Sequence, residues 1–318
     1  MKVHYVMPMA GKGSRFSKDG FDLPKPLLEI YGMPFFYWAT RSISKFIELS
    51  SINFVVLQEH IEKFSIDKVI KKFFPKARII ALPKVTEGAV ITSMKGIEEI
   101  NDDLPIIFND CDHLFKSEKF NEFCNLKYDS TIDGILLTFE ANEPKYSFIE
   151  KDSNGNVIRT IEKEVISDEA ICGCYYFKNK DVFLKSADKY LINCNYNEYF
   201  MSGVYNVMIE NNKKIKSMKT DFIMEVKIFL LSIFFMIMGH IFKIKRWGLL
   251  ISVYEKPVEY NLLNAMTLGH TLNTVFPIRI GDIVRVMWAG KKLKNSYSFS
   301  LATVIADLYI DFITVGAI

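Results

Sequence analysis

Two cationic side chains near the start of the chain, Arg15 and Lys25, stand among residues that suit them to binding phosphate. A short apolar run over residues 3–9 leads into the glycine-containing loop 10–16, and Lys25 follows between two prolines. Glycines let the backbone approach an anion closely and turn its N–H groups toward the oxygens. An arginine can bond two phosphate oxygens at once, and a lysine supplies a compact positive charge. The pattern therefore predicts a loop that binds a triphosphate.

Two better-known glycine motifs do not fit this loop. A dinucleotide-binding fingerprint would need a third glycine where Phe16 stands, and a P-loop would need serine or threonine where Gly13 stands. On glycine spacing alone, the alternative is a β-turn that carries solvated basic residues.

A second group of residues that could do chemistry, Asp110 and Asp112, follows the apolar run 104–109. If the strand stays extended, residues two apart lie on one side of it. Carboxylate oxygens at a strand end suit Mg²⁺, which keeps several waters and bridges substrate phosphates. The alternative is that these acidic residues only begin a turn.

The patterns of strands and helices indicate how these two groups are positioned. β-prone runs at 52–57 and 78–82 alternate with helical patterns at 35–43 and 61–74, and residues 146–158 read as a β-hairpin. Strands that alternate with helices predict a parallel sheet covered by helices. Ligands of such sheets bind at the carboxyl ends of the strands, which is where the glycine-containing loop is expected.

The loop 10–16, the Pro24-Lys25-Pro26 step and the turn Gly32-Met33-Pro34 together resemble the signature of nucleotidylyltransferases that activate sugar phosphates and phosphocholine-like compounds. The resemblance implies a Rossmann-like α/β fold with helices on both faces of the sheet. It also implies transfer of a nucleotidyl group from an NTP, either CTP or another, to a sugar phosphate or small phosphate monoester. Pyrophosphate would be released, Mg²⁺ would be the cofactor, and cell-surface polysaccharide biosynthesis would be the setting.

The same resemblance implies roles for single residues. The expected catalytic residues are Arg15, Lys25 and Asp112, and the expected metal ligands are Asp112 first and Asp110 second. The expected nucleotide-binding residues are Ala10, Gly11, Lys12, Gly13, Ser14, Arg15, Lys25 and Gly88. The expected substrate-binding residues are Glu162, Lys163 and Gly173. Without the resemblance, Gly88 reads as part of a helix N-terminus, and the Glu162-Lys163 step reads as a solvated ion pair.

The resemblance to nucleotidylyltransferases ends near residue 222, so we expect one domain over residues 1–222 and a second over 223–318. The Gly-Thr-Pro-containing segment that usually follows in the family is not found, and neither is the second metal-binding acidic residue that many members carry. Glu198 and Asp221 are the candidates to replace that residue, and activity would depend on such a replacement.

The second domain begins with an apolar stretch over residues 226–242, which is about the shortest length that spans a membrane as a helix. The Arg246-Trp247 pair, the step from Gly269 to Asn273 and the string 277–285 resemble the lysylphosphatidylglycerol-synthase and flippase-like membrane family. We therefore expect an α-helical membrane domain. We expect it to be truncated, because the chain ends at Ile318 within an apolar run.

Charged residues of this second domain are expected to face its interior. Arg279, Asp282 and Arg285 recur every three residues, so a helix would gather them near one face. Asp307 and Asp311, four apart in an apolar stretch, would avoid lipid in the same way. The alternative for the first three is a cytosolic loop with ordinary charges.

Composition excludes other classes of protein. A net charge of +3, with no basic arm and no zinc-finger spacing, indicates that nucleic acid is not a partner. The five cysteines lack a Cys-x-x-Cys pair and read as core residues. No signal peptide pattern precedes the first strand, so the N-terminal domain is expected in the cytoplasm, held at the membrane by the second domain. The rival hypothesis is a membrane lipid-handling protein whose N-terminal domain binds a nucleotide without catalysis.

Overall fold

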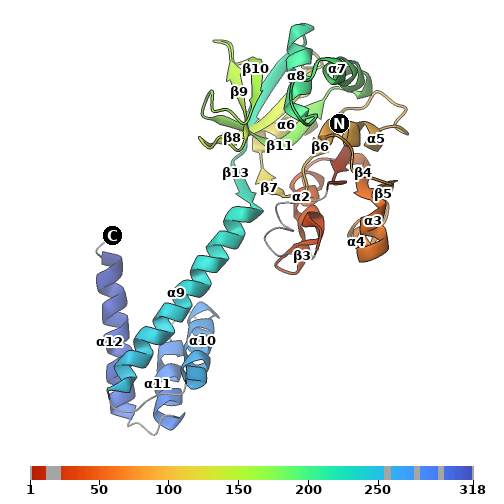
Figure 1. Cartoon of the computed structure of the whole chain (residues 1–318). Helices are drawn as coiled ribbons and strands as arrows, with labels where there is room; N and C mark the ends of the chain where they lie inside the picture. The colour runs from red at the N-terminus through yellow and green to blue at the C-terminus, as the bar shows by residue number, and fades with distance from the viewer. Residues whose placement is uncertain (1, 12–22, 254–258, 276–279, 293–296, 317–318) are drawn as a thin grey trace. The chain divides into compact units, whose positions relative to one another are not determined.

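A computed structural model describes residues 2–11, 23–253, 259–275, 280–292 and 297–316. The chain divides into two compact units, Met1–Val226 and Lys227–Ile318, both of which are traced in Figure 1. The domain boundary expected after residue 222 falls within a short strand, β13 (Phe222–Glu225).

Within the described residues, the first unit is built on a nine-stranded mixed sheet. Its strands are β1 (Val3–Pro8), β4 (Leu49–Leu57), β5 (Arg78–Leu82), β6 (Ile106–Asn109), β8 (Gly134–Glu140), β9 (Ser147–Lys151), β10 (Val157–Glu162), β11 (Glu169–Phe177) and β12 (Ile215–Lys219). Strands β6, β1, β4 and β5 pair in parallel. Strand β11 runs antiparallel to β6, β8 and β9, and β12 pairs in parallel with β8.

The predicted parallel pairing holds for β6, β1, β4 and β5, but β11 pairs antiparallel with β6, β8 and β9, which the alternation of strands and helices did not predict. The predicted hairpin is present, since β9 and β10 pair antiparallel around a turn over residues 152–156. A turn of this length cannot cross over to a parallel neighbour, because a parallel connection needs a dozen residues or more. The parallel part still has its carboxyl strand ends on one edge of the sheet, where the predicted sites lie.

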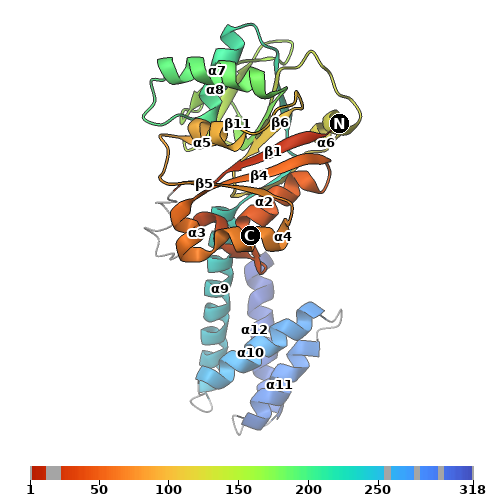
Figure 2. The ribbon, with the colours of Figure 1, turned by 90° about the vertical axis from the view of Figure 1, so that its right-hand side faces the viewer.

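Helices cover both faces of the sheet, as the α/β prediction requires (Figure 2). Alternate residues of the central strand separate the two cores: Tyr5 and Met7 pack into one, and Val6 into the other. The first core is completed by α2 (Phe35–Ser44), α4 (Ile66–Phe73) and α6 (Glu118–Asn125). The second is completed by α5 (Ala89–Gly96), α7 (Lys180–Asn193) and α8 (Met201–Glu210).

The single helix predicted over residues 61–74 is instead two helices. The first, α3 (Gln58–Phe64), ends at Ser65, whose φ of 51° lies in the left-handed region, and α4 begins directly afterwards. A left-handed residue turns the chain and ends the helical hydrogen-bond pattern. Apolar spacing alone did not show this break.

Three short elements lie beside the main sheet and carry residues of the predicted site. A 3₁₀ turn, η1 (Lys25–Leu27), precedes a two-residue hairpin formed by β2 (Glu29–Ile30) and β3 (Met33–Pro34). Strand β7 (His113–Lys116) pairs antiparallel with β13.

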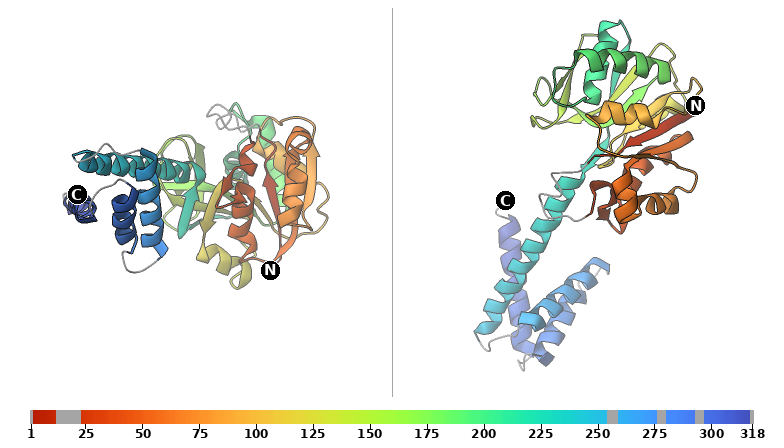
Figure 3. Two further views of the ribbon diagram at one scale, coloured as in Figure 1. Left: turned by 90° about the horizontal axis from the view of Figure 1, so that it is seen from below. Right: turned by 45° about the vertical axis from the view of Figure 1, so that its right-hand side comes forward.

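The second unit consists, in its described part, of four helices, which Figure 3 shows from two further directions. They are α9 (Val226–Ser252), α10 (Glu259–Val275), α11 (Ile280–Lys292) and α12 (Tyr297–Gly316). Trp247, Ile251 and Leu262 are buried among these helices. Among the residues that the structure describes, we find no helix with both the length and the apolar character needed to cross a membrane.

Candidate active site

The glycine-containing loop leaves the sheet at the carboxyl end of β1, as predicted. The N–H of Met9 donates to the carbonyl oxygen of Val55 at 3.0 Å, Ala10 is buried and Gly11 is exposed. The other residues predicted for this loop lie outside the described part of the chain, namely Lys12, Gly13, Ser14 and Arg15. Their roles stay predictions.

Lys25 and Asp112 bring the two predicted groups into direct contact. Lys25 opens η1 directly after Pro24, and its Nζ lies 2.7 Å from Oδ2 of Asp112. The side chains of Lys25 and Asp112 are 27% and 23% exposed, so solvent and ligands can reach the pair. The buried Pro26 fixes the turn that carries Lys25.

Each member of this pair favours the charged form of the other. Burial disfavours the charged form of Lys25, but the Asp112 carboxylate outweighs burial and raises the pKa of Lys25 above its ordinary value. Burial likewise disfavours the Asp112 carboxylate, but Lys25 and then His113 outweigh it and lower the pKa of Asp112. The site therefore holds an ammonium next to a carboxylate at neutral pH.

Asp110 is placed against Gly173 by the pairing of β6 with β11. The N–H of Asp110 donates to the carbonyl oxygen of Gly173 at 2.9 Å. Gly173 has a φ of 80°, and a Cβ at this position would lie 2.6 Å from Oδ2 of Asp110, so glycine is required there. Burial raises the pKa of Asp110 to about 6, and the charge of Asp112 acts in the same direction.

The pairing of β7 with β13 places the backbone of an acidic residue, Glu225, beside the site, and sequence reasoning missed this placement. The backbone of Glu225 stands opposite that of His113, whose Nδ1 lies 3.5 Å from Oδ1 of Asp112. Strand β13 is an apolar run that ends in an acidic residue, as the run before Asp110 does. That pattern was the signal in the sequence.

Asp221 and Glu198, the two candidates that the sequence offered for a second metal-binding acidic residue, lie in different surroundings. Asp221 accepts a hydrogen bond from the N–H of Glu118 at 2.7 Å and donates its own N–H to the carbonyl of Lys116. It therefore caps the start of α6. Glu198 is exposed in the loop before α8.

Glu162 ends β10, Lys163 follows it, and both contact side chains of neighbouring elements. Oε2 of Glu162 accepts hydrogen bonds from the hydroxyls of Ser147 and Ser202, the latter at 2.8 Å. Lys163 has a φ of 58°, in the left-handed region, and its Nζ lies 4.6 Å from the centre of the Phe200 ring. A lysine held in this region is strained by about 1 kcal/mol, as residues at binding sites often are. The pair is therefore more ordered than a solvated ion pair.

Gly88 packs against the loop that precedes α8. A Cβ at Gly88 would lie 2.4 Å from the backbone nitrogen of Tyr199. The N–H of Tyr199 donates to the carbonyl of Glu87 at 3.1 Å, and its carbonyl accepts from the N–H of Val90 at 3.1 Å. This packing requires a glycine, so the base contact expected of Gly88 stays a prediction.

A small apolar cavity of about 140 Å³ adjoins the pair formed by Lys25 and Asp112. It is lined by Ile30, Tyr31, Phe35, Trp38, Asp112, His113 and Leu114. An apolar wall strengthens electrostatic interactions next to it, because fewer waters screen them.

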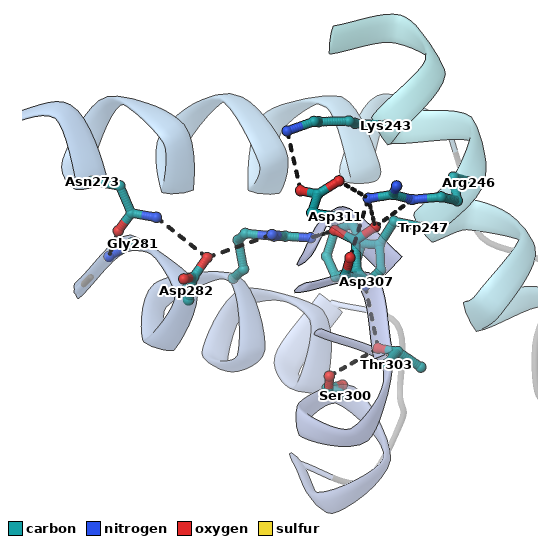
Figure 4. A network of polar contacts seen from close by, with 11 residues as sticks. Lys243, Arg246, Trp247, Asn273, Gly281, Asp282, Ser300, Thr303, Asp307 and Asp311 are labelled. Carbon is teal, nitrogen blue, oxygen red and sulfur yellow. Dashed lines mark hydrogen bonds and ion pairs between the residues drawn. The ribbon is translucent and has the colours of Figure 1, made fainter. Parts of the chain in front are cut away.

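The second unit contains a connected set of charged residues, drawn in Figure 4. Asp307 is 2% exposed and accepts hydrogen bonds from Arg246 at 2.6 Å and from Arg285 at 2.8 Å. Asp311 pairs with Arg246 at 2.8 Å and Lys243 at 3.1 Å, and Asp282 lies 3.5 Å from Arg285. Asp307 therefore lies in the interior of the unit, whereas Asp311 is 31% exposed, and Arg279 lies outside the described residues.

Two protein families match this chain. The nucleotidyl transferase family matches residues 6–247, and the lysylphosphatidylglycerol synthase TM region matches residues 215–318. Among curated relatives, the bifunctional protein GlmU of Oenococcus oeni is 28% identical over 223 residues, which are 67% of this chain and 43% of that protein. This chain therefore spans less than half the length of that relative.

Solved structures resemble the first unit. A nucleoside-diphosphate-sugar pyrophosphorylase from Vibrio cholerae RC9 is 25% identical with a TM-score of 0.59, over 68% of this chain and 91% of that one. The inositol-1-phosphate CTP transferase from T. maritima is 14% identical with a TM-score of 0.57, over 71% and 89% of the two chains. At 14% identity, the similarity to the T. maritima enzyme shows a shared fold and nothing about function.

Proposed function

We propose a reaction for this chain on the premise that it belongs to the nucleotidyl transferase family, to which residues 6–247 match. The proposed reaction transfers a nucleotidyl group from an NTP to a sugar phosphate or another small phosphate monoester. An oxygen of the acceptor phosphate attacks the α-phosphorus in line. The bond from that phosphorus to the bridging oxygen breaks, and pyrophosphate leaves.

The observation that carries this proposal is the 2.7 Å contact between Nζ of Lys25 and Oδ2 of Asp112. An ammonium held at a fixed point next to the α-phosphate would stabilise the charge that builds up on its oxygens. The carboxylate keeps Lys25 charged and aligned before the substrate arrives. Arg15, in the preceding loop, is the proposed partner for the leaving phosphates.

Asp112 and Asp110 are the proposed ligands of Mg²⁺, and Glu225 is the added candidate from β13. Carboxylate oxygens are the donors that this ion prefers, and the backbone of Glu225 brings a third acidic residue to the register of His113. When bound, Mg²⁺ would neutralise charge on the phosphates. The described residues contain no preformed cluster of three or more metal-binding side chains.

We also propose that the second unit attaches the protein to a membrane and that the first unit lies in the cytoplasm. Support comes from the match to the lysylphosphatidylglycerol synthase TM region and from the distribution of side chains. Phe235, Met236 and Leu249 are 63%, 67% and 71% exposed, whereas Asp307 and Arg285 are buried. Apolar surface outside and paired charges inside suit apolar surroundings.

Pyrophosphate release tests the proposed reaction. The full chain would be incubated with each of the four common NTPs, with Mg²⁺, and with a panel that includes glucose 1-phosphate, N-acetylglucosamine 1-phosphate and phosphocholine. Release that requires both an acceptor and a divalent ion is the expected result. No release with any pair would contradict the proposed reaction.

The rival function is a membrane lipid-handling protein whose first unit binds a nucleotide without catalysis. The ion pairs of the second unit favour it, because they join three cations and three carboxylates, among them the buried Asp307 and Arg285. Binding of NTP by calorimetry without pyrophosphate release would favour this rival.

A further inference from the structure

The carboxylate of Glu162 is held by two serine hydroxyls from different elements. Ser147 and Ser202 both donate to the same oxygen, Oε2, with Ser202 at 2.8 Å. Ser147 begins β9 and stands directly opposite Glu162 in the antiparallel pair, whereas Ser202 lies in the first turn of α8 and is 2% exposed. Two hydroxyl donors fix both the position and the rotation of one carboxylate.

The scaffold behind these serines is itself fastened. Oγ1 of Thr160 donates to the carbonyl oxygen of Ser202 at 2.8 Å, which joins β10 to α8. Asn206 accepts the N–H of Thr160 at 2.7 Å and donates its amide to the carbonyl of Thr160 at 2.8 Å. Ser202 therefore cannot move relative to Glu162 without breaking a set of buried hydrogen bonds.

The other oxygen of this carboxylate, Oε1, accepts no hydrogen bond from any residue in the described ranges. Glu162 is partly exposed, and it is close enough to Asp110 for its charge to raise the pKa of that partly buried carboxyl. Oε1 is thus a hydrogen-bond acceptor whose lone pairs point in a fixed direction, and it lies at the site that also contains Asp110 and Gly173.

We propose that Ser147 and Ser202 are positioning residues, which orient Glu162 so that Oε1 accepts a hydrogen bond from a hydroxyl of a sugar-phosphate acceptor. This proposal rests on the proposed function, and it narrows the acceptor to one class. A hydroxyl donates along a defined direction, so a carboxylate with a fixed rotation binds it better than a freely rotating one. The trimethylammonium group of phosphocholine has no donor, and its attraction to a carboxylate depends mainly on distance.

Steady-state kinetics of the full chain test this proposal with glucose 1-phosphate and phosphocholine as probes. Ser202→Ala and Ser147→Ala should each lower kcat/KM for the sugar phosphate by about threefold to tenfold, mostly through KM for the acceptor, while KM for the NTP stays the same. The Ser147→Thr variant keeps a hydroxyl donor, so its kcat/KM for the sugar phosphate should be close to the wild-type value. Activity with phosphocholine should be lower than with the sugar phosphate and should not change in these variants.

A matched control and a double variant separate positioning from general damage. Ser186→Ala removes a serine of similar burial in α7, whose hydroxyl donates to Val182 at 2.9 Å, and it should leave all constants unchanged. In a Glu162→Ala background, Ser202→Ala should have no further effect, because it acts only through that carboxylate.

The outcomes are distinguishable. If the wild-type chain is active but neither serine variant lowers kcat/KM, only the positioning role is overturned. The same holds if Ser202→Ala lowers kcat/KM equally in the wild-type and Glu162→Ala backgrounds. A wild-type chain that prefers phosphocholine overturns the assignment of the acceptor. A wild-type chain that releases no pyrophosphate with any acceptor overturns the proposed function and, with it, this role.

Discussion

Nζ of Lys25 lies 2.7 Å from Oδ2 of Asp112, and this contact joins the loop after the first strand to the end of β6. Each residue alone has an ordinary explanation, since a lysine between prolines can be solvated and an aspartate after a strand can begin a turn. Together they form a partly exposed ion pair beside the partly buried Asp110, at the carboxyl ends of the parallel strands. Such an edge is where α/β sheets bind ligands.

Substitution of Gly173 should destabilise the first unit and damage the site. In Gly173→Ala, a Cβ would lie 2.6 Å from Oδ2 of Asp110 at a φ of 80°, so the free energy of unfolding should fall by about 2–4 kcal/mol. Gly155→Ala is the control, because its φ is 72° but no atom lies within 4 Å of the added Cβ, and about 1 kcal/mol is expected. Urea unfolding of both variants measures the difference, and equal losses would contradict the packing argument.

Four of the five cysteines should resist alkylation in the folded protein. Burial raises the pKa of Cys111, Cys124 and Cys172 to about 12 and raises that of Cys174 as well, so few thiolates form at pH 8. Cys194 is only partly buried. Mass spectrometry after a short treatment with iodoacetamide should find the label at Cys194 alone. Rapid labelling of Cys172 or Cys174 would show that the core beside Gly173 opens readily.

Stability should depend on pH through Asp102, at the opposite end of the sheet. Partial burial raises its pKa, but hydrogen bonds from His4 at 2.7 Å and from the N–H of Leu104 outweigh this and lower the pKa. A lowered folded pKa stabilises the fold above the unfolded value of about 3.9, and the contribution is lost as pH falls through the folded pKa. Asp102→Asn should therefore cost less than about 1 kcal/mol at pH 7, and the difference should shrink below about pH 4. A difference independent of pH in urea titrations would contradict this.

The ion pairs of the second unit should differ in strength according to burial. Asp307→Ala leaves Arg246 and the 5% exposed Arg285 without their shared carboxylate, so a loss of about 3–5 kcal/mol is expected. Asp311→Ala removes a partner that is 31% exposed, and about 1 kcal/mol or less is expected. Hydrogen exchange of α9 and α12 in both variants measures this, and similar protection in the two would contradict a central role for Asp307.

The sequence singled out Lys25 and Asp112, which the structure places 2.7 Å apart, because residue types in a set order indicate a chemistry that does not depend on the details of the fold. It predicted helices on both faces of the sheet because strands and helices alternate. It did not predict the antiparallel pairing of β11, the break at Ser65 or the register of Glu225. These three features depend on turn geometry and on pairing between segments that are distant in the sequence. The spacing of apolar residues does not predict either. The serines that hold Glu162 are missed for the same reason, since Ser202 meets that residue only through the packing of α8 on β10.

The most direct test of the central claim compares turnover with nucleotide binding in Lys25→Met. Single-turnover pyrophosphate release should fall by about 100-fold or more, because the charge opposite the reacting phosphate is gone, while the Kd for NTP rises by less than about tenfold. Lys45→Met, which removes a lysine just beyond the end of α2, should leave both unchanged. If Lys25→Met releases pyrophosphate at the wild-type rate, Lys25 does not act in the reaction and the account given for its pairing with Asp112 is wrong.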